Sequence, residues 1–88
     1  MNLTKENVAI LRTPFSKVWN AIGPDILEGE PDINSRGIIE ACWDCDRLTE
    51  YTIDASLGIT AETLVKELIN VNGYHQTAAF LATEFKFA

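Results

Sequence analysis

The chain of 88 residues is 47% hydrophobic and has a formal net charge of −6 at pH 7, which predicts one folded domain over residues 1–88 and excludes a disordered chain. No run reaches the roughly 18 apolar residues of a membrane span, the amino terminus has no secretory signal pattern, and two cysteines make no disulfide framework, so we expect a cytoplasmic protein. The negative charge argues against direct contact with nucleic acid or with an anionic membrane surface.

The first part of the chain predicts helical structure. Residues 4–12 fit either a helix or a short buried strand, because periodicity does not separate the two. The next signal is clearer: Thr13 suits an N-cap, Pro14 suits the first helical position, and apolar residues then recur at helical spacing. The pair Gly23-Pro24 predicts the end of this helix.

The middle of the chain carries the excess negative charge. Residues 25–32 contain Gly29 and Pro31 among four acids and predict an acidic loop. Residues 25–54 hold nine acidic residues against two arginines, a net charge of −7, whereas the rest of the chain holds four acidic and five basic residues. Such a field favours encounter with a basic protein surface. The alternative is a solvated surface that serves solubility alone.

A second helix is predicted from about residue 34 to residue 51, with both cysteines on its apolar stripe. Cys42 and Cys45 have the CxxC spacing of metal and redox sites, but neighbouring carboxylates and a position inside the helix disfavour a thiolate. A zinc site would need two more ligands, and the chain has a single histidine, His75. We therefore expect two core-facing thiols, with no metal and no other cofactor.

The same helix places carboxylates around a tryptophan. Like-charge pairs at i, i+4, Glu40 with Asp44 and Asp46 with Glu50, would each cost about 0.2 to 0.5 kcal/mol. A helix that tolerates this repulsion indicates a negative face kept for a partner, with Trp43 as its aromatic anchor. The alternative is that Trp43 widens the buried face. The predicted partner-binding residues are Asp25, Glu28, Glu30, Asp32, Glu40, Trp43, Asp44, Asp46 and Glu50.

The last third predicts a short strand or extended link over residues 51–57, followed by two helices. Thr60 suits the N-cap of the first, which ends at residues 72–73, and the second carries apolar residues between Tyr74 and Phe85. The short turn predicts that these helices pack as an antiparallel hairpin. The expected fold is thus mainly α, a small compact bundle of four to five short helices.

One segment resembles the helix-turn-helix of many bacterial DNA-binding regulators. The match over residues 53–68 consists of the run 55–60, then Thr63, Leu64 and Leu68. The resemblance implies a DNA-binding regulator, although Asp54 stands where that family usually has a small residue. The implied recognition helix has no arginine, so it would supply little charge to neutralise phosphates.

These features lead to one expected function and two alternatives. We expect a non-enzymatic acidic protein-binding module, an inhibitor or nucleic-acid mimic of the phage or mobile-element kind, because no catalytic triad, phosphate loop or second histidine supports an enzyme. The first alternative is a homo-oligomeric structural or assembly subunit, such as a homodimer, that buries its last helix and Phe87 against a copy of itself. The second alternative is the helix-turn-helix regulator.

Overall fold

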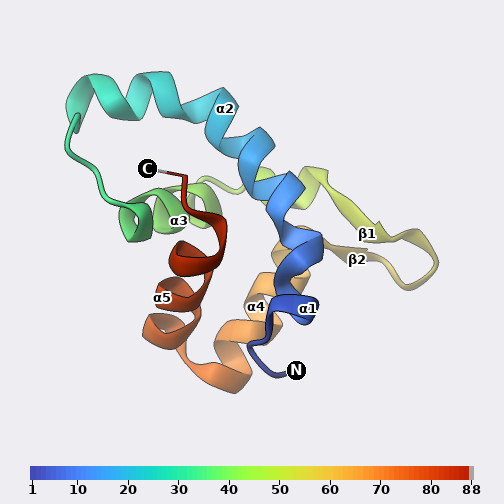
Figure 1. The fold of residues 1–88 in the computed structure, drawn as a ribbon. Coiled ribbons are helices and arrows are strands. Elements are labelled where there is room, and N and C mark those ends of the chain that lie inside the picture. Colours follow the sequence, from blue (N-terminus) through green and yellow to red (C-terminus); the bar gives the residue numbers. More distant parts are fainter. Residues whose placement is uncertain (88) are drawn as a thin grey trace.

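The computed structural model describes residues 1–87 and is mainly α-helical, as the sequence predicts (Figure 1). Five α-helices, a short two-stranded sheet and three short 3₁₀ helices account for most of these residues. In chain order they are α1 (Lys5–Val8), η1 (Ala9–Leu11), α2 (Arg12–Gly29), α3 (Ser35–Asp44), η2 (Arg47–Glu50), β1 (Thr52–Asp54), η3 (Ala55–Leu57), β2 (Ile59–Thr60), α4 (Ala61–Asn72) and α5 (Tyr74–Phe85).

The amino-terminal segment is helical, which decides between the two structures that its sequence allows. Thr4 is the N-cap of α1, and its side chain accepts a hydrogen bond from the backbone N–H of Asn7 at 3.1 Å. The prediction that Thr13 caps the next helix is wrong. The N-cap of α2 is Leu11, whose backbone is already helical, so α2 follows η1 without a side-chain cap.

The predicted end of this helix at Gly23-Pro24 is also wrong. α2 runs through Pro24 to Gly29, and its ribbon changes direction along its length in Figure 1. Proline disfavours a helical conformation in the residue before it partly by a clash with the Cβ of that residue, and Gly23 has no Cβ. Residues 25–29 of the predicted acidic loop are therefore helical, and only residues 30–34 connect α2 to α3.

The second predicted helix is shorter than expected. Asn34 caps α3 by accepting a hydrogen bond from the backbone N–H of Gly37 at 2.8 Å, but this helix ends at Asp44. Asp46 has a φ of 62°, a left-handed conformation that aspartate tolerates better than most residues. The chain continues as η2, so Asp46 and Glu50 do not form the predicted like-charge pair along one α-helix.

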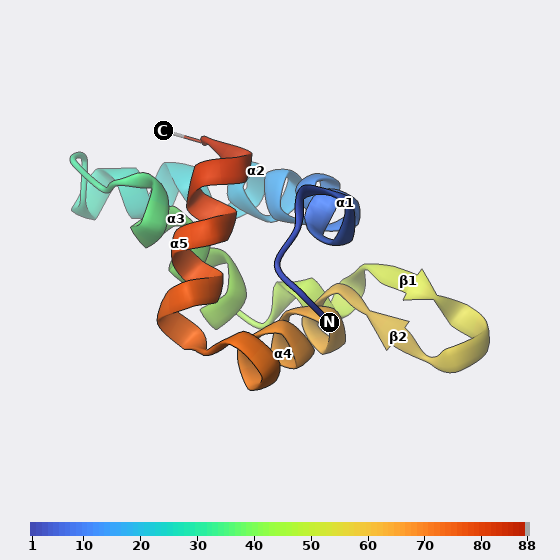
Figure 2. The same cartoon turned by 60° about the horizontal axis from the view of Figure 1, so that its bottom comes forward.

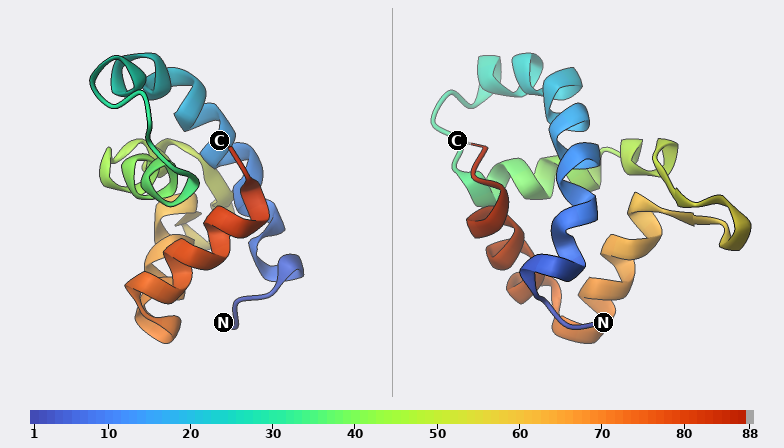
Figure 3. Two further views of the ribbon diagram at one scale, coloured as in Figure 1. Left: turned by 60° about the vertical axis from the view of Figure 1, so that its left-hand side comes forward. Right: turned by 45° about the vertical axis from the view of Figure 1, so that its right-hand side comes forward.

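A short β-hairpin occupies the place of the first helix of the helix-turn-helix resemblance. β1 pairs antiparallel with β2, and η3 and Gly58, which has a φ of 66°, connect the two strands. The Asp54 side chain accepts a hydrogen bond from the backbone N–H of Ser56 at 3.0 Å. The predicted strand near residues 51–57 is confirmed, whereas residues 53–59 form no α-helix ahead of α4. The hairpin projects from the helices in Figures 2 and 3.

The last two helices begin and end where the sequence predicts. Thr60 caps α4 by accepting a hydrogen bond from the N–H of Thr63 at 3.3 Å, and Gly73 alone, with a φ of 91°, separates α4 from α5. From this connection α4 and α5 run in roughly opposite directions, form a V and pack against each other (Figure 1). α5 packs against α3 as well as α4.

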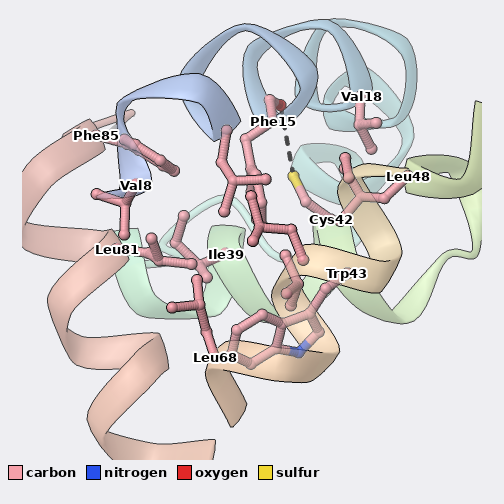
Figure 4. Packing of buried hydrophobic residues seen from close by; sticks show 14 of the residues in the cluster. Val8, Phe15, Val18, Ile39, Cys42, Trp43, Leu48, Leu68, Leu81 and Phe85 are labelled. Atoms are coloured by element: carbon pink, nitrogen blue, oxygen red, sulfur yellow. Dashed lines mark hydrogen bonds between the residues drawn. The ribbon is translucent and has the colours of Figure 1, made fainter. Parts of the chain in front are cut away.

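The core lies where α2, α3, α4 and α5 meet (Figure 4). Its fully buried members include Phe15 of α2 and Cys42 of α3, whose thiol points at the carbonyl oxygen of Phe15 at 3.8 Å. The Phe85 ring is also buried, and its centroid lies 5.5 Å from that of Phe15. Phe87 packs on Phe85 at 5.8 Å. The aromatic tail thus fills space within its own chain.

Candidate functional site

The structure exposes most of the predicted partner-binding residues and buries one of them. Trp43 is 8% exposed and belongs to the core, as the alternative interpretation of this residue expected, while Glu40 is half-buried. The exposed acids are Asp25, Glu28, Glu30, Asp32, Asp44, Asp46 and Glu50. Any partner that used Trp43 would contact only the small part of its side chain that is exposed.

Three of the predicted acids, the exposed Asp25 and Glu30 and the half-buried Glu40, line one groove between α2 and α3, which we call the acidic groove. It has a volume of about 400 Å³ and is lined by Asp25, Ile26, Gly29, Glu30, Ile33, Gly37, Glu40 and Ala41. The helical extension of α2 beyond Pro24 contributes Asp25, Ile26 and Gly29 to this lining. Gly29 borders open space, since a Cβ placed there would meet no atom within 4 Å.

The lining of the acidic groove combines apolar side chains and glycines with three carboxylates. Between Lys17 and Arg36 the sequence has four acids and no base. The two ion pairs of residues 1–87 are Arg36 with Glu40 at 3.0 Å and Lys66 with Glu62 at 3.3 Å. The four acids of residues 25–32 therefore have no ion-pair partner in the described structure, and their field extends into solvent.

Behind the groove, hydrogen bonds connect α3 to α5. The phenol of Tyr74 donates to Oε2 of Glu40 at 3.1 Å and accepts from Nε1 of Trp43 at 3.3 Å. Oε1 of Glu40 accepts from Nε of Arg36 at 3.0 Å, and Arg36 also donates to Nδ1 of His75. We call these five residues the Glu40 network. It fixes the position of the one groove carboxylate that is half-buried.

Tyr74 lies in a negative environment. Burial raises the pKa of its phenol above the ordinary value, the hydrogen bond from Trp43 opposes this, and the carboxylates of Glu40 and Asp44 raise the pKa further. Burial is the largest cause of this shift, and the two carboxylates add to it because a nearby negative charge disfavours the phenolate. A cation at this position would be favoured by the same carboxylates.

A second, smaller pocket adjoins the network on the side of α4, and we call it the aromatic pocket. It has a volume of about 150 Å³ and is lined by Trp43, Asp44, Leu48, Glu62, Val65, Lys66, Ile69 and Tyr74. The structure places the other predicted residues elsewhere. Glu50 borders a groove between the start of α2 and β1. Glu28 lies on α2 and Asp32 in the connection to α3, and neither lines the acidic groove. Asp46 follows α3.

The CxxC cysteines face the core, as predicted, and are free thiols. Burial, with a smaller contribution from Cys45, raises the pKa of the Cys42 thiol to about 12. Cys45 is half-buried and donates to the carbonyl oxygen of Cys42 at 3.1 Å. In residues 1–87, no three His, Cys, Asp or Glu side chains converge on a position where a metal ion could bind.

Sequence periodicity did not reveal two residues that the structure adds to the site. Tyr74 and Glu62 lie on helices whose apolar stripes were recognised, but their contacts with α3 residues depend on how the helices cross. No helix within the described residues is long and apolar enough to cross a lipid bilayer. Comparison of the chain with protein-family models, curated protein sequences and solved structures finds no match.

Proposed function

We propose that this chain is a non-enzymatic protein-binding module that docks on a basic protein surface through the acidic groove. The observation that carries the proposal is the groove itself, which has a volume of about 400 Å³ and is lined by the carboxylates Asp25, Glu30 and Glu40 together with apolar side chains. The apolar side chains supply contact area, and the carboxylates supply attraction and orientation. The groove thus suits a partner segment that combines apolar and basic side chains.

Charge gives the groove its selectivity. Unpaired carboxylates at one end of a small protein create a field that increases the encounter rate with a positive surface and repels a negative one. Ions screen this field with a Debye length of about 10 Å at 0.1 M salt. Association is therefore expected to weaken strongly as the salt concentration rises.

The surfaces with the highest positive charge belong to proteins that bind nucleic acid. A module that occupies such a surface would exclude the nucleic acid and act as an inhibitor or nucleic-acid mimic, as small acidic proteins of phages and mobile elements do. We include this role, and the cytoplasmic location expected from the sequence, in the proposal. Among the alternatives, a homo-oligomer built on the aromatic tail has less support, because Phe85 is buried within its own chain.

The test uses two variants that remove the same charge at different places. Asp25→Asn with Glu30→Gln removes the two groove charges that have no ion-pair partner in the described structure, and Glu6→Gln with Glu67→Gln removes two exposed charges on α1 and α4. Each chain is immobilised, and proteins retained from a lysate are identified by mass spectrometry at low and high salt. We expect basic proteins to be retained at low salt by the wild type and by the second variant only. Equal retention by both variants, or retention that resists high salt, would contradict the proposal.

A further inference from the structure

The aromatic pocket has the dimensions of a site for one side chain. Its volume of about 150 Å³ is well below the roughly 300 Å³ at which sites for drug-sized ligands begin. Trp43 and Tyr74 form one wall, with ring centroids 4.9 Å apart and an interplanar angle of 62°. Val65 and Ile69 of α4 add apolar surface to its lining. A long side chain with an apolar stem fits this shape.

The charge around the pocket favours a cation. Lys66, the one base that lines it, is paired with Glu62 at 3.3 Å, and its side chain is 74% exposed. Asp44 is exposed and has no ion-pair partner in the described structure. Asp44 is thus the uncompensated charge at the mouth of the pocket, and Tyr74, which is 36% exposed, presents its ring beside it.

We propose that the aromatic pocket binds one arginine side chain of the partner, with the arginine stem on Val65 and Ile69 and the guanidinium between the Tyr74 ring and the Asp44 carboxylate. Arginine suits this site better than lysine, because its planar guanidinium stacks on an aromatic ring and donates paired hydrogen bonds to a carboxylate. The identity of the arginine as a partner residue rests on the proposed function.

The geometry also connects this pocket to the acidic groove. Tyr74 belongs to the aromatic pocket, and its phenol donates to Glu40, which lines the groove. The two hydrogen bonds on the Tyr74 hydroxyl hold its ring in place before a ligand arrives, and preorganisation of this kind lowers the entropic cost of binding. A basic segment in the groove would therefore have the arginine pocket at its side.

The test reads the pocket directly through Trp43 fluorescence. Trp19→Phe leaves Trp43 as the only tryptophan, because the chain has two. This protein is titrated with three probes: N-acetyl-arginine amide, a hexa-arginine peptide and a hexa-lysine peptide. We expect Trp43 fluorescence to respond to both arginine probes, and hexa-arginine to bind about threefold to tenfold more tightly than hexa-lysine.

Two single-charge variants in this background provide the matched comparison. Asp44→Asn removes the carboxylate at the pocket and should weaken hexa-arginine binding by about threefold to tenfold. Asp46→Asn removes the same charge two residues away, outside the pocket, and asparagine tolerates the left-handed conformation of this residue. It should change the affinity by less than twofold. Circular dichroism melting curves establish that each variant is folded.

The outcomes separate this inference from the proposed function. If both hexapeptides bind equally and the two Asp variants behave alike, while Asp25→Asn with Glu30→Gln abolishes binding, the arginine pocket is refuted and the acidic groove stands. A second outcome is that N-acetyl-arginine amide changes Trp43 fluorescence only when Asp44 is present, while the affinity for both hexapeptides is unchanged by Asp25→Asn with Glu30→Gln. The pocket then stands and the proposed function fails. If no probe changes Trp43 fluorescence, the pocket is refuted.

Discussion

The phenol of Tyr74 donates a hydrogen bond to Oε2 of Glu40 at 3.1 Å, across 34 positions of sequence. This contact brings the start of α5 against the middle of α3, next to the acidic groove. Glu40 also accepts from Arg36, so its carboxylate is held from two sides. The position of this acid therefore depends on tertiary structure, whereas the other groove acids are positioned by α2 and its end.

Removing the hydroxyl of Tyr74 should destabilise the fold measurably. We expect Tyr74→Phe to lower the free energy of unfolding by about 0.5 to 1.5 kcal/mol, because two hydrogen bonds are lost at a half-exposed position. Urea denaturation measures the change. Tyr51→Phe is the control, since the Tyr51 hydroxyl makes no hydrogen bond in the described structure. A loss of equal size in both variants would contradict this role.

The one-residue connection between α4 and α5 should tolerate only glycine. Gly73 has a φ of 91°, so we expect Gly73→Ala to lower the free energy of unfolding by about 1 to 3 kcal/mol. Gly29→Ala is the matched control, because Gly29 ends a helix and its added Cβ would meet nothing within 4 Å. That variant should be neutral or more stable by up to about 1 kcal/mol. Thermal melting of both variants provides the comparison.

Helix type and most helix starts were predictable from the sequence, because caps and apolar periodicity are local. Thr60 caps α4 and Asn34 caps α3, as their neighbours indicate. The end of α2 was not predictable by the same rules, since Gly23-Pro24 ordinarily ends a helix. Here the glycine removes the Cβ that would clash with the proline ring. The acidic groove depends on this exception. Its acidic residues could therefore be recognised from the sequence, but their arrangement in space could not.

The angle between α4 and α5 could likewise not be predicted from local sequence patterns. A single glycine in an extended left-handed conformation sends α5 across α3, which creates the Tyr74 to Glu40 contact and the aromatic pocket. Trp43 shows the same limit, because its helical position is compatible with both a surface anchor and a core residue. Its burial follows from the packing of α4 and α5 against α3, which periodicity within one helix does not specify.

Burial of Cys42 should make stability depend on alkaline pH. Its folded pKa is raised to about 12 from an ordinary value of 9.0, so above about pH 9 the unfolded chain releases the thiol proton while the folded chain retains it. Stability is then complete below pH 9 and decreases as the pH rises toward 12. At pH 10 the loss should be about 1 kcal/mol.

The measurement for Cys42 is the change in melting temperature between pH 8 and pH 10. Cys42→Ala should show a smaller decrease than the wild type, although it is less stable at both values. Cys45→Ser, which leaves Cys42 as the only thiol, should react with a thiol reagent at pH 8 no faster than the chain unfolds. Rapid modification of Cys42 in the folded protein would contradict its burial.

Replacement of Trp43 by alanine should strongly destabilise the fold. Trp43 is 8% exposed, so we expect Trp43→Ala to lower the free energy of unfolding by about 3 to 5 kcal/mol, a large part of the stability of a small domain. Trp43→Phe keeps an aromatic ring and should lose less. An unchanged melting curve for Trp43→Ala would show that the side chain does not contribute to the core.

The acids of the groove should reduce stability, as expected for residues kept for binding. Asp25 repels Glu28 at i, i+3 on α2, and Glu30 lies at the negative carboxyl end of that helix. Asp25→Asn with Glu30→Gln should therefore raise the free energy of unfolding by about 0.5 to 1 kcal/mol, or the melting temperature by about 2 to 8 °C, while it weakens partner binding.

The control for this trade-off removes the same charge away from the groove. Glu6 lies in the first turn of α1, where a negative charge is favourable, so Glu6→Gln with Glu67→Gln should not stabilise the fold. Added salt should stabilise the wild type more than the groove variant, because salt screens the repulsion that the variant lacks. If the groove variant melted at or below the wild-type temperature, the repulsion would be absent and the carboxylates would need no binding role to explain their presence.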